Sequence, residues 1–497
     1  MNRRRVLLVG GVVVLLVALV AFWGGRPGAE VEDVDRPAVP TAGTKGDLSS
    51  TWFCAAGALS AAQSARHTVF LTNPTSRPAV VTLNGFSQTA RLGAKQVLVG
   101  PRSSATADAD GLFGAGASVM VESPVAPLSV VHRLQNSVYA DQTACATATS
   151  DRWYFLSQST VRGAGATLVL FNPFSVDAGA DVRIGLEGGV RSPRALNGIV
   201  VPAGQTRYVA LGESVQRRDA FTATVQMRSG RLVAETVQVF DGTNGPRGMR
   251  MQLGVPAARD HWSFAGGFTG ANAAERVVLH NPGRSTVTAL VQVTPYGGAA
   301  NPPDPFEVEV PPLRFTTLDL GGESRVPGVG YHSVDVQSDA PVVVARTNTL
   351  SGAPGTGQQG VPTRPALTRG TAVGTGTPVQ ATDWIVPAVR TGPAQRSLVM
   401  VHNTSAGIAL LHVTVLLDGK RAVPTGFDRY ELASGDSVLV PVGPAGVPDG
   451  SVSVQVESST PVVVENLSTF FGTDDLAMDL GIPLPGGPGS VTSLAGG

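Results

Sequence analysis

The chain has 497 residues, and its charge is balanced, with 37 lysines and arginines against 37 aspartates and glutamates. This length implies about three to five domains, and the zero net charge argues against a nucleic-acid partner or a polybasic membrane patch. With 42% hydrophobic and 15% charged residues, the chain lacks the signature of intrinsic disorder. Its 60 glycines and 36 prolines suit many short strands joined by turns, so we expect a folded multidomain protein.

The first expected element is a membrane-crossing helix at residues 6–23. Arg3, Arg4 and Arg5 precede this uncharged run, which as a helix spans roughly 27 Å, enough for one membrane crossing. The positive cluster predicts a cytoplasmic N-terminus and an exported remainder. Small residues at suitable cleavage positions are lacking. We therefore expect a retained signal-anchor within residues 1–25, with cleavage and secretion as the alternative, and a flexible tether at 26–50.

The two cysteines, Cys54 and Cys145, are expected to form a disulfide. An exported chain meets an oxidising environment, and no third cysteine competes for pairing. A disulfide that closes a loop of about 90 residues stabilises its domain by roughly 4–5 kcal/mol in the chain-entropy model.

The exported region is a fourfold repeat in which a tryptophan opens each unit. The distance from this tryptophan to an asparagine that ends an apolar strand is 21, 19, 19 and 19 residues. Asparagine before proline, as in three of the four units, favours a turn at a strand end. The repeat positions are Trp52, Trp153, Trp262 and Trp384, with Asn73, Asn172, Asn281 and Asn403. We expect each tryptophan to be a buried packing residue with the same role in every unit.

Further strands are predicted in every unit. Strands of alternating polarity follow each asparagine, and two strands around a Ser/Gly/Pro turn follow later, which predicts a β-hairpin. Three units end in a Gly-Val/Ile-Pro signature, at Gly254, Gly360 and Gly481. In the first unit Cys145 lies near that place, so we expect the disulfide to replace the closing strand there.

These patterns predict an all-β chain of four tandem immunoglobulin- or fibronectin-like β-sandwiches, with a β-propeller-like arrangement as the alternative. Helical periodicity is missing outside the apolar N-terminal run. The expected parts are units at 51–149, 150–258, 259–363 and 382–486, a linker at 364–381 and a flexible tail at 487–497.

The N-terminal anchor, the Trp52-x-Cys54 opening, the strand-Asn-Pro motif and an excess of arginine over lysine resemble a family of exported, membrane-anchored envelope proteins. These are proteins of unknown function from high-GC Gram-positive, actinobacterial-type bacteria. The resemblance implies location and repeated β architecture, and it carries no catalytic residues.

The chain has no HExxH pair, nucleophile elbow or phosphate-binding loop. We therefore expect no catalytic, cofactor-binding or metal-binding residues. The expected function is that of a non-catalytic extracytoplasmic scaffold, spacer or accessory subunit whose partner is another envelope protein. The alternative is a cell-wall glycan-binding protein.

Overall fold

The computed structural model describes residues 37–43, 49–124, 127–299, 301–326, 330–352, 365, 367–442, 451–484 and 492–493. The expected membrane segment at 6–23 lies outside these residues. Within the described part, no helix is long and apolar enough to span a membrane.

The described chain is built almost entirely of strands, as the sequence predicts, and each of its four units contains two antiparallel sheets. In unit 1 the first sheet has the order β1-β6-β3-β4, and the second has the order β5-β2-β7-β8. Units 2, 3 and 4 repeat this connectivity. A single helical turn, α2 (Ala109–Phe113), follows β5 in unit 1.

Unit 1 consists of β1 (Ser50–Cys54), β2 (Arg66–Asn73), β3 (Ala79–Phe86), β4 (Arg91–Val99), β5 (Ser103–Asp108), β6 (Ser118–Ser123), β7 (Ser129–Gln135) and β8 (Ala140–Ala144). Unit 2 consists of β9 (Arg152–Gln158), β10 (Ala164–Asn172), β11 (Ala178–Leu186), β12 (Gly189–Arg191), β13 (Ile199–Val201), β14 (Gln205–Ala210), β15 (Phe221–Ser229), β16 (Val233–Asp241) and β17 (Arg247–Leu253), with short 3₁₀ turns η2 (Arg194–Leu196) and η3 (Leu211–Glu213).

Unit 3 consists of β18 (Arg259–Thr269), β19 (Ala273–His280), β20 (Val287–Pro295), β21 (Phe306–Val310), β22 (Phe315–Asp319), η4 (Leu320–Gly322), β23 (Gly330–Ser351) and β24 (Arg369–Thr375). Unit 4 consists of β25 (Val379–Arg390), β26 (Gln395–His402), β27 (Ala409–Leu417), β28 (Lys420–Ala422), β29 (Tyr430–Leu432), β30 (Ser437–Val440), β31 (Ser451–Phe470), β32 (Asp475–Leu480) and β33 (Ile482–Pro483). The short strand β34 (Thr492–Ser493) pairs with β25.

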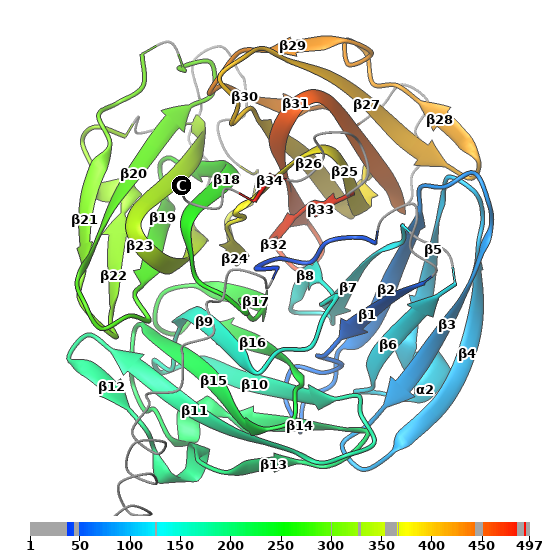
Figure 1. The fold of residues 1–497 in the computed structure, drawn as a ribbon, viewed down its shortest axis with the longest axis vertical. Helices are drawn as coiled ribbons and strands as arrows, with labels where there is room; N and C mark the ends of the chain where they lie inside the picture. The colour runs from blue at the N-terminus through cyan, green and yellow to red at the C-terminus, as the bar shows by residue number, and fades with distance from the viewer. Residues whose placement is uncertain are drawn as a thin grey trace, which may run out of the picture. The chain divides into compact units, whose positions relative to one another are not determined.

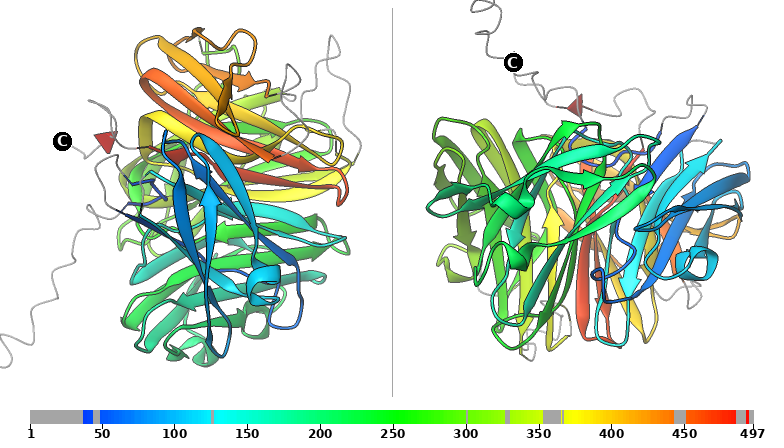
Figure 2. Two further views of the ribbon diagram at one scale, coloured as in Figure 1. Left: turned by 90° about the vertical axis from the view of Figure 1, so that its right-hand side faces the viewer. Right: turned by 90° about the horizontal axis from the view of Figure 1, so that it is seen from below.

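The four units form a ring with a propeller-like arrangement (Figure 1). The last strand of each unit's second sheet, which we call its closing strand, lies at the centre: β8, β17, β24 and β32. Each closing strand contacts the closing strands of both neighbouring units. Figure 2 shows the strands of neighbouring units standing side by side around this centre. The propeller-like alternative therefore describes the arrangement, while each unit keeps two sheets.

The prediction of a β-hairpin in each unit is wrong, because the two strands of each expected hairpin belong to different sheets. In unit 1, β6 pairs with β1 and β3, whereas β7 pairs with β2 and β8. In units 3 and 4 the corresponding segment is one long strand, β23 or β31, that passes from the first sheet to the second. The Ser/Gly/Pro turn signal marks the place where the chain changes sheets, because each half has its own buried face to satisfy.

Two further expectations differ from the structure. The predicted linker at 364–381 contains β24, the closing strand of unit 3. The Gly360 signature lies outside the described residues, and Gly376 follows β24 in the place that Gly254 and Gly481 have after β17 and β32. Unit 1 has a closing strand, β8, so the disulfide does not replace it.

Part of the predicted tether at 26–50 is packed. Ala38, Val39 and Ala42 are buried, and they belong to the hydrophobic clusters of units 3, 4 and 1 respectively. The Ala42 N–H donates to the Pro483 carbonyl of β33 at 3.1 Å. The first described residues therefore hold three units together. Of the predicted tail at 487–497, only β34 is described.

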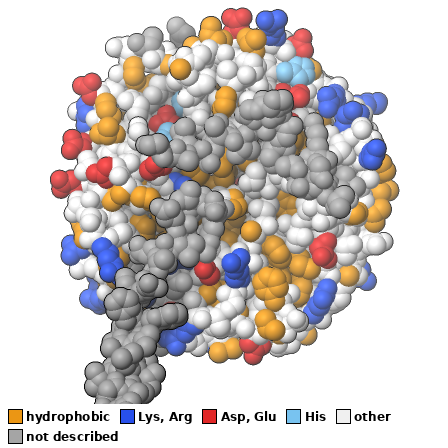
Figure 3. Space-filling model, in the orientation of Figure 1, with side chains coloured by type: hydrophobic (Ala, Val, Ile, Leu, Met, Phe, Trp, Pro, Cys, Tyr) orange, Lys and Arg blue, Asp and Glu red, His pale blue; other side chains and the backbone are white. Residues whose placement is uncertain are grey.

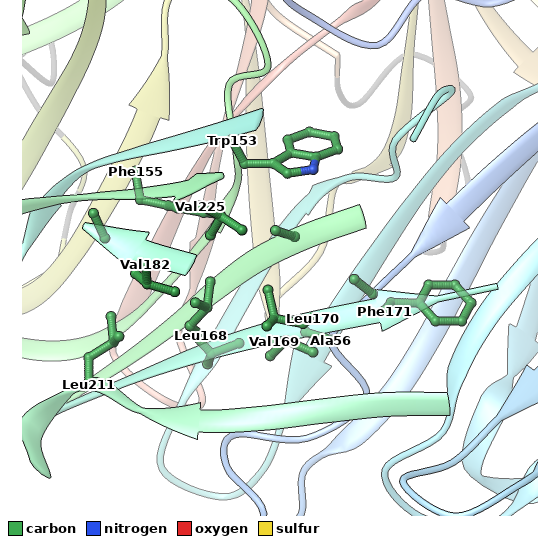
Figure 4. Packing of buried hydrophobic residues seen from close by; sticks show 14 of the residues in the cluster. Ala56, Trp153, Phe155, Leu168, Val169, Leu170, Phe171, Val182, Leu211 and Val225 are labelled. Carbon is green, nitrogen blue, oxygen red and sulfur yellow. The ribbon is translucent and has the colours of Figure 1, made fainter. Parts of the chain in front are cut away.

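Each unit has a core between its two sheets. In unit 2, Trp153, Phe155 and Val225 of the first sheet face Leu168 and Leu170 of the second (Figure 4). Alternating apolar residues provide these inner faces. Outside, charges of both signs are scattered with many toward the rim of the visible face (Figure 3), in agreement with the zero net charge.

Candidate functional site: the axis of the ring and the unit interfaces

Charged side chains gather at the ring's centre because the closing strands are edge strands. Each closing strand is the last strand of its unit's second sheet, so one side of its backbone has no ladder partner in that sheet. Buried backbone N–H groups need acceptors. Acidic side chains from neighbouring closing strands supply several of them.

Asp475 on β32 accepts one backbone N–H from each of the four closing strands. The donors are Ala140 at 3.4 Å, Met249 at 2.8 Å, Thr371 at 3.4 Å and its own neighbour Leu476 at 3.0 Å. Each donor lies six residues before the residue of its unit that bridges back to the first sheet. Four equivalent donors thus converge on one carboxylate.

Two further aspartates complete this buried cluster. Asp141 on β8 accepts the Met251 N–H of β17, and Asp479 on β32 accepts the side-chain amide of Gln142 on β8 at 3.0 Å. Burial raises the pKa of Asp141 and Asp475 well above the usual range. Burial also raises the pKa of Asp479 to about 7, although the Gln142 amide opposes the shift. These carboxyl groups bind neighbouring strands within a closed core.

At the interface of units 1 and 2, His132 and Glu235 form a fully buried contact. His132 Nε2 lies 3.2 Å from Glu235 Oε2, which also accepts the Ala56 N–H at 3.3 Å. On its other side, His132 Nδ1 lies 3.1 Å from His67 Nε2. Burial and the neighbouring His132 lower the pKa of His67 to about 3, so His67 is neutral at pH 7.

The interface of units 3 and 4 repeats this arrangement with an arginine. Arg346 Nη2 lies 3.2 Å from Glu465 Oε2, and Glu465 Oε2 accepts the Gly266 N–H at 2.8 Å. Gly266 is four residues after Trp262, as Ala56 is four residues after Trp52. The ring therefore has an approximate twofold repeat of unit pairs within its fourfold repeat.

The corresponding glutamate position is apolar in units 1 and 3. Val131 and Ala345 stand there, one residue before His132 and Arg346, and both are fully buried. At each of these two interfaces a buried glutamate accepts a backbone N–H from the neighbouring unit. These hydrogen bonds specify which faces meet, because a buried polar group left unpaired in the wrong register is costly.

The four repeat asparagines are buried and make the same bonds in each unit. The Asn281 side-chain amide donates to the Ser285 and Val310 carbonyls at 2.7 and 2.9 Å, and its oxygen accepts the Gly283 N–H at 2.8 Å. The other three repeat this pattern of a carbonyl four residues ahead and a carbonyl on a neighbouring turn or strand. Each asparagine thus fixes the turn after its strand.

The four repeat tryptophans are buried, with at most 2% of their surface exposed. In units 2, 3 and 4 the indole N–H donates to the carbonyl of Leu232, Val342 or Val462, at 2.9 to 3.1 Å. These carbonyls lie where the chain passes from the first sheet to the second. Trp52 differs because its buried indole nitrogen has no acceptor among the residues that the structure describes.

Cys54 and Cys145 form the predicted disulfide. Their sulfur atoms and a ring nitrogen of His132 lie within 4.8 Å of one another. Because the two sulfurs are bonded to each other, they are not thiolate ligands for a metal.

The sequence reasoning missed the buried charges. The repeat pattern assigns no role to Asp475, Glu235 or Arg346. The sequence does contain one signal for the glutamates. Glu235 and Glu465 each interrupt an apolar segment that is predicted to be a buried strand. Their partners lie about 100 residues away along the chain, which no local pattern reveals.

One protein family matches part of this chain. A family of unknown function, DUF5719, matches residues 140–379, which run from β8 to the first residue of β25. No curated protein matches.

Among solved structures, a Thermotoga maritima protein (Crystal Structure of Thermotoga maritima 1070) is 18% identical, with a TM-score of 0.19, and the match covers 24% of this chain and 93% of that one. The Anabaena sensory rhodopsin transducer is 21% identical, with a TM-score of 0.16, and the match covers 18% and 82%. A tetra-tandem repeat of a large adhesion protein is 11% identical, with a TM-score of 0.08, and the match covers 83% and 93%.

Proposed function

We propose that this chain is a non-catalytic scaffold of the cell envelope, held outside the membrane by residues 6–23 and presenting its ring to a protein partner. The observation that carries the proposal is the way the buried acidic side chains are used. Asp475, Glu235 and Glu465 all bind groups of neighbouring units. Polar groups used in this way make a ring rigid and specify its geometry, which is what a platform for another protein requires.

The disulfide supports the extracytoplasmic side of the proposal. Disulfides persist in exported proteins and are rare in the reducing cytosol. The Cys54–Cys145 bond joins β1 to the residue after β8. It therefore stabilises unit 1, against which unit 4 packs when the ring closes.

The tryptophans favour this proposal over glycan binding. Sugar sites use exposed aromatic faces, whereas the four repeat tryptophans are buried. A glycan site would therefore have to use other residues.

Crosslinking in intact cells tests the proposal. The full chain carrying an affinity tag is crosslinked, purified under denaturing conditions and analysed by mass spectrometry, with a tagged unrelated single-pass exported protein as control. We expect one envelope protein to be recovered in near-stoichiometric amount with this chain only. Recovery of cell-wall glycan without a protein, or turnover of a substrate in a hydrolase screen, would contradict the scaffold function.

Protease treatment of spheroplasts tests the location separately. External protease should remove the region after residue 26, while a cytoplasmic marker protein stays intact. Protection of that region in intact spheroplasts would exclude an extracytoplasmic scaffold.

A further inference from the structure

The first sheet of each unit ends at the rim of the ring in an edge, whose strands we call rim strands (Figure 1). In units 2 and 4 this edge is interrupted, because two pieces of three residues, β12 with β13 and β28 with β29, share one neighbouring strand. In units 1 and 3 it is continuous, as β4 with nine residues and β21 with five. Short, broken edges prevent pairing with another chain, so units 1 and 3 keep the two edges to which a further strand can add.

The rim strands β4 and β21 lie on opposite sides of the ring (Figure 1). Among the described strands, β4 pairs only with β3, and β21 pairs only with β20. Residues 91–96 of β4 are all exposed, and Leu98 has 66% of its surface exposed. On β21, Glu307 and Glu309 are exposed. The Glu309 carbonyl accepts the Thr316 hydroxyl at 2.8 Å, so an added strand meets the part of β21 that precedes this group.

The two rim strands carry opposite charge. From residue 48 to residue 107 the chain has no acidic and five basic residues, among them Lys95 of β4. From residue 301 to residue 323 it has five acidic residues, among them Glu307 and Glu309 of β21, and one basic residue. Opposite charges facing each other on paired strands are stabilising, and like charges are destabilising. The charges therefore oppose pairing of either rim strand with its own copy and favour pairing of β4 with β21.

These charges have no ionic partner within the chain. Among the described residues, no opposite charge lies within 4.0 Å of Lys95, Glu307 or Glu309. Arg91 and Arg325, by contrast, each stack on a phenylalanine ring of their own unit and donate to neutral oxygen atoms. Lys95 on β4 and the two glutamates on β21 are thus available to a neighbouring molecule.

Lys95 and the two glutamates stand on different faces of their sheets. Lys95 lies opposite the buried Leu83, on the side of the sheet that faces the core of unit 1. Glu307 lies opposite Leu290, which is 46% exposed, on the outer face of the first sheet of unit 3. Glu309 lies two residues further along and shares this face. The charges meet only if the outer face of unit 3 continues the core side of unit 1.

The ring itself provides this arrangement. The outer face of the first sheet packs on unit 2 in unit 1, through Phe86 and Phe171, and on unit 4 in unit 3, through Asp335 and His402. Both faces therefore point to the next unit around the ring, and on opposite sides of a ring these directions are opposite. When two rings lie side by side in one orientation, with β4 of one against β21 of the other, the outer face of unit 3 continues the core side of unit 1.

We propose that copies of this chain associate head to tail, with β4 of one ring paired to β21 of the next and Lys95 beside Glu307 and Glu309 of that neighbour. Each ring in such a pair keeps one free rim strand, so the contact is heterologous and extends into an open row. A single contact through the five residues of β21 is small and therefore weak. The inference does not rest on the scaffold function, because a monomeric ring also serves as a platform.

Carbodiimide crosslinking of the purified full chain in detergent tests the contact, because this reagent joins an amine to a touching carboxylate with loss of water. Lys45, Lys95 and Lys420 are the only lysines, so the crosslinked peptides are readily assigned. We expect mass spectrometry to show Lys95 joined to Glu307 or Glu309 in dimers and larger products. Since these residues lie on opposite sides of one ring, the bond joins two chains. Lys95→Arg should still associate but lose this bond.

Sedimentation velocity of the same preparation measures the association. We expect the average mass of the unaltered chain to rise past that of a dimer as its concentration increases. Lys95→Glu alone, or Glu307→Lys/Glu309→Lys alone, should weaken association at least about tenfold, because each places like charges opposite each other. An equimolar mixture of these two variants should associate again, since their altered strands are complementary. Lys420→Glu, on the interrupted edge of unit 4, is the matched control and should associate like the unaltered chain.

All the substituted residues are exposed, and thermal unfolding of each variant shows that it is folded. A chain that stays monomeric at every concentration and gives no Lys95 crosslink would overturn the inference and leave the scaffold function standing. Association that survives Lys95→Glu, or a mixture of the two complementary variants that stays monomeric, would overturn it as well.

Discussion

Cys145 occupies in unit 1 the position that Gly254 occupies in unit 2. Each directly precedes the residue that bridges back to the strand carrying its unit's tryptophan, through Ala146↔Phe53 and Val255↔Tyr154. A side chain at Gly254 would lie 2.7 Å from the Phe155 ring. Phe155 follows Trp153 by two residues, as Cys54 follows Trp52. The disulfide of unit 1 therefore takes the place of the contact between Phe155 and Gly254 in unit 2.

Removing this disulfide should destabilise unit 1. Cys54→Ala/Cys145→Ala is expected to lower the free energy of unfolding by about 2–5 kcal/mol, because the unfolded chain regains the freedom of a long loop. Denaturant titration of the full chain under non-reducing conditions measures the change. The matched variant Cys54→Phe/Cys145→Gly copies unit 2 and should recover about 1.5–3 kcal/mol through burial of the ring. Equal stability of the two variants would show that the positions are not equivalent.

Trp262→Ala should lower the free energy of unfolding by about 3–5 kcal/mol, because it removes a large side chain from a closed core. Trp262→Phe removes the indole hydrogen bonds to the Arg259 and Val342 carbonyls, and Trp52→Phe is its control because the Trp52 nitrogen has no acceptor among the described residues. We expect Trp262→Phe to cost about 1 kcal/mol more than Trp52→Phe. Unchanged melting of Trp262→Ala would contradict the packing role.

Asn281→Asp should be more destabilising than its small change of shape suggests. The asparagine amide donates to two carbonyls, and a carboxylate cannot donate while ionised. We expect a loss of about 2–4 kcal/mol from two unmade buried hydrogen bonds, measured by thermal unfolding at pH 7. Asn301→Asp, at an exposed turn, is the control and should melt like the unaltered chain.

Asp479→Asn should change how stability depends on pH. Burial raises the pKa of Asp479 to about 7, so folding disfavours its ionised form, and the folded chain loses stability as the pH rises from about 4 to about 7. Asparagine stays neutral, and its oxygen can accept the Gln142 and Asn466 amides that now bond Asp479 Oδ1.

Relative to the unaltered chain, Asp479→Asn should gain about 2–4 kcal/mol between pH 4 and pH 7 and no more above it. Denaturant midpoints at several pH values measure this gain, with the exposed Asp219→Asn as control. A constant difference between the two chains at all pH values would show that Asp479 does not titrate in this range.

The spacing of the tryptophans and asparagines predicts four all-β units because both residues have the same task in every unit. Trp262 and Asn281 make contacts within their own unit that recur in other units, and recurring contacts leave a recurring pattern. The closing strand of unit 3 was mistaken for a linker because a second glycine signature precedes it in the sequence. Asp475 could not be predicted, because three of its donors come from strands at least 104 residues away.

The contact between Ala42 and Pro483 has a consequence for the order of folding. Residues at the start of the folded region meet residues near its end, and the β32 aspartates bind β8 across the same closure. During synthesis, units 1, 2 and 3 emerge while the fourth side of the ring is still missing. One face of unit 1 therefore stays exposed until the last strands have been synthesised and have packed against it. A chain truncated before residue 475 would keep that face open permanently, so the C-terminal strands control when the whole molecule becomes resistant to proteases.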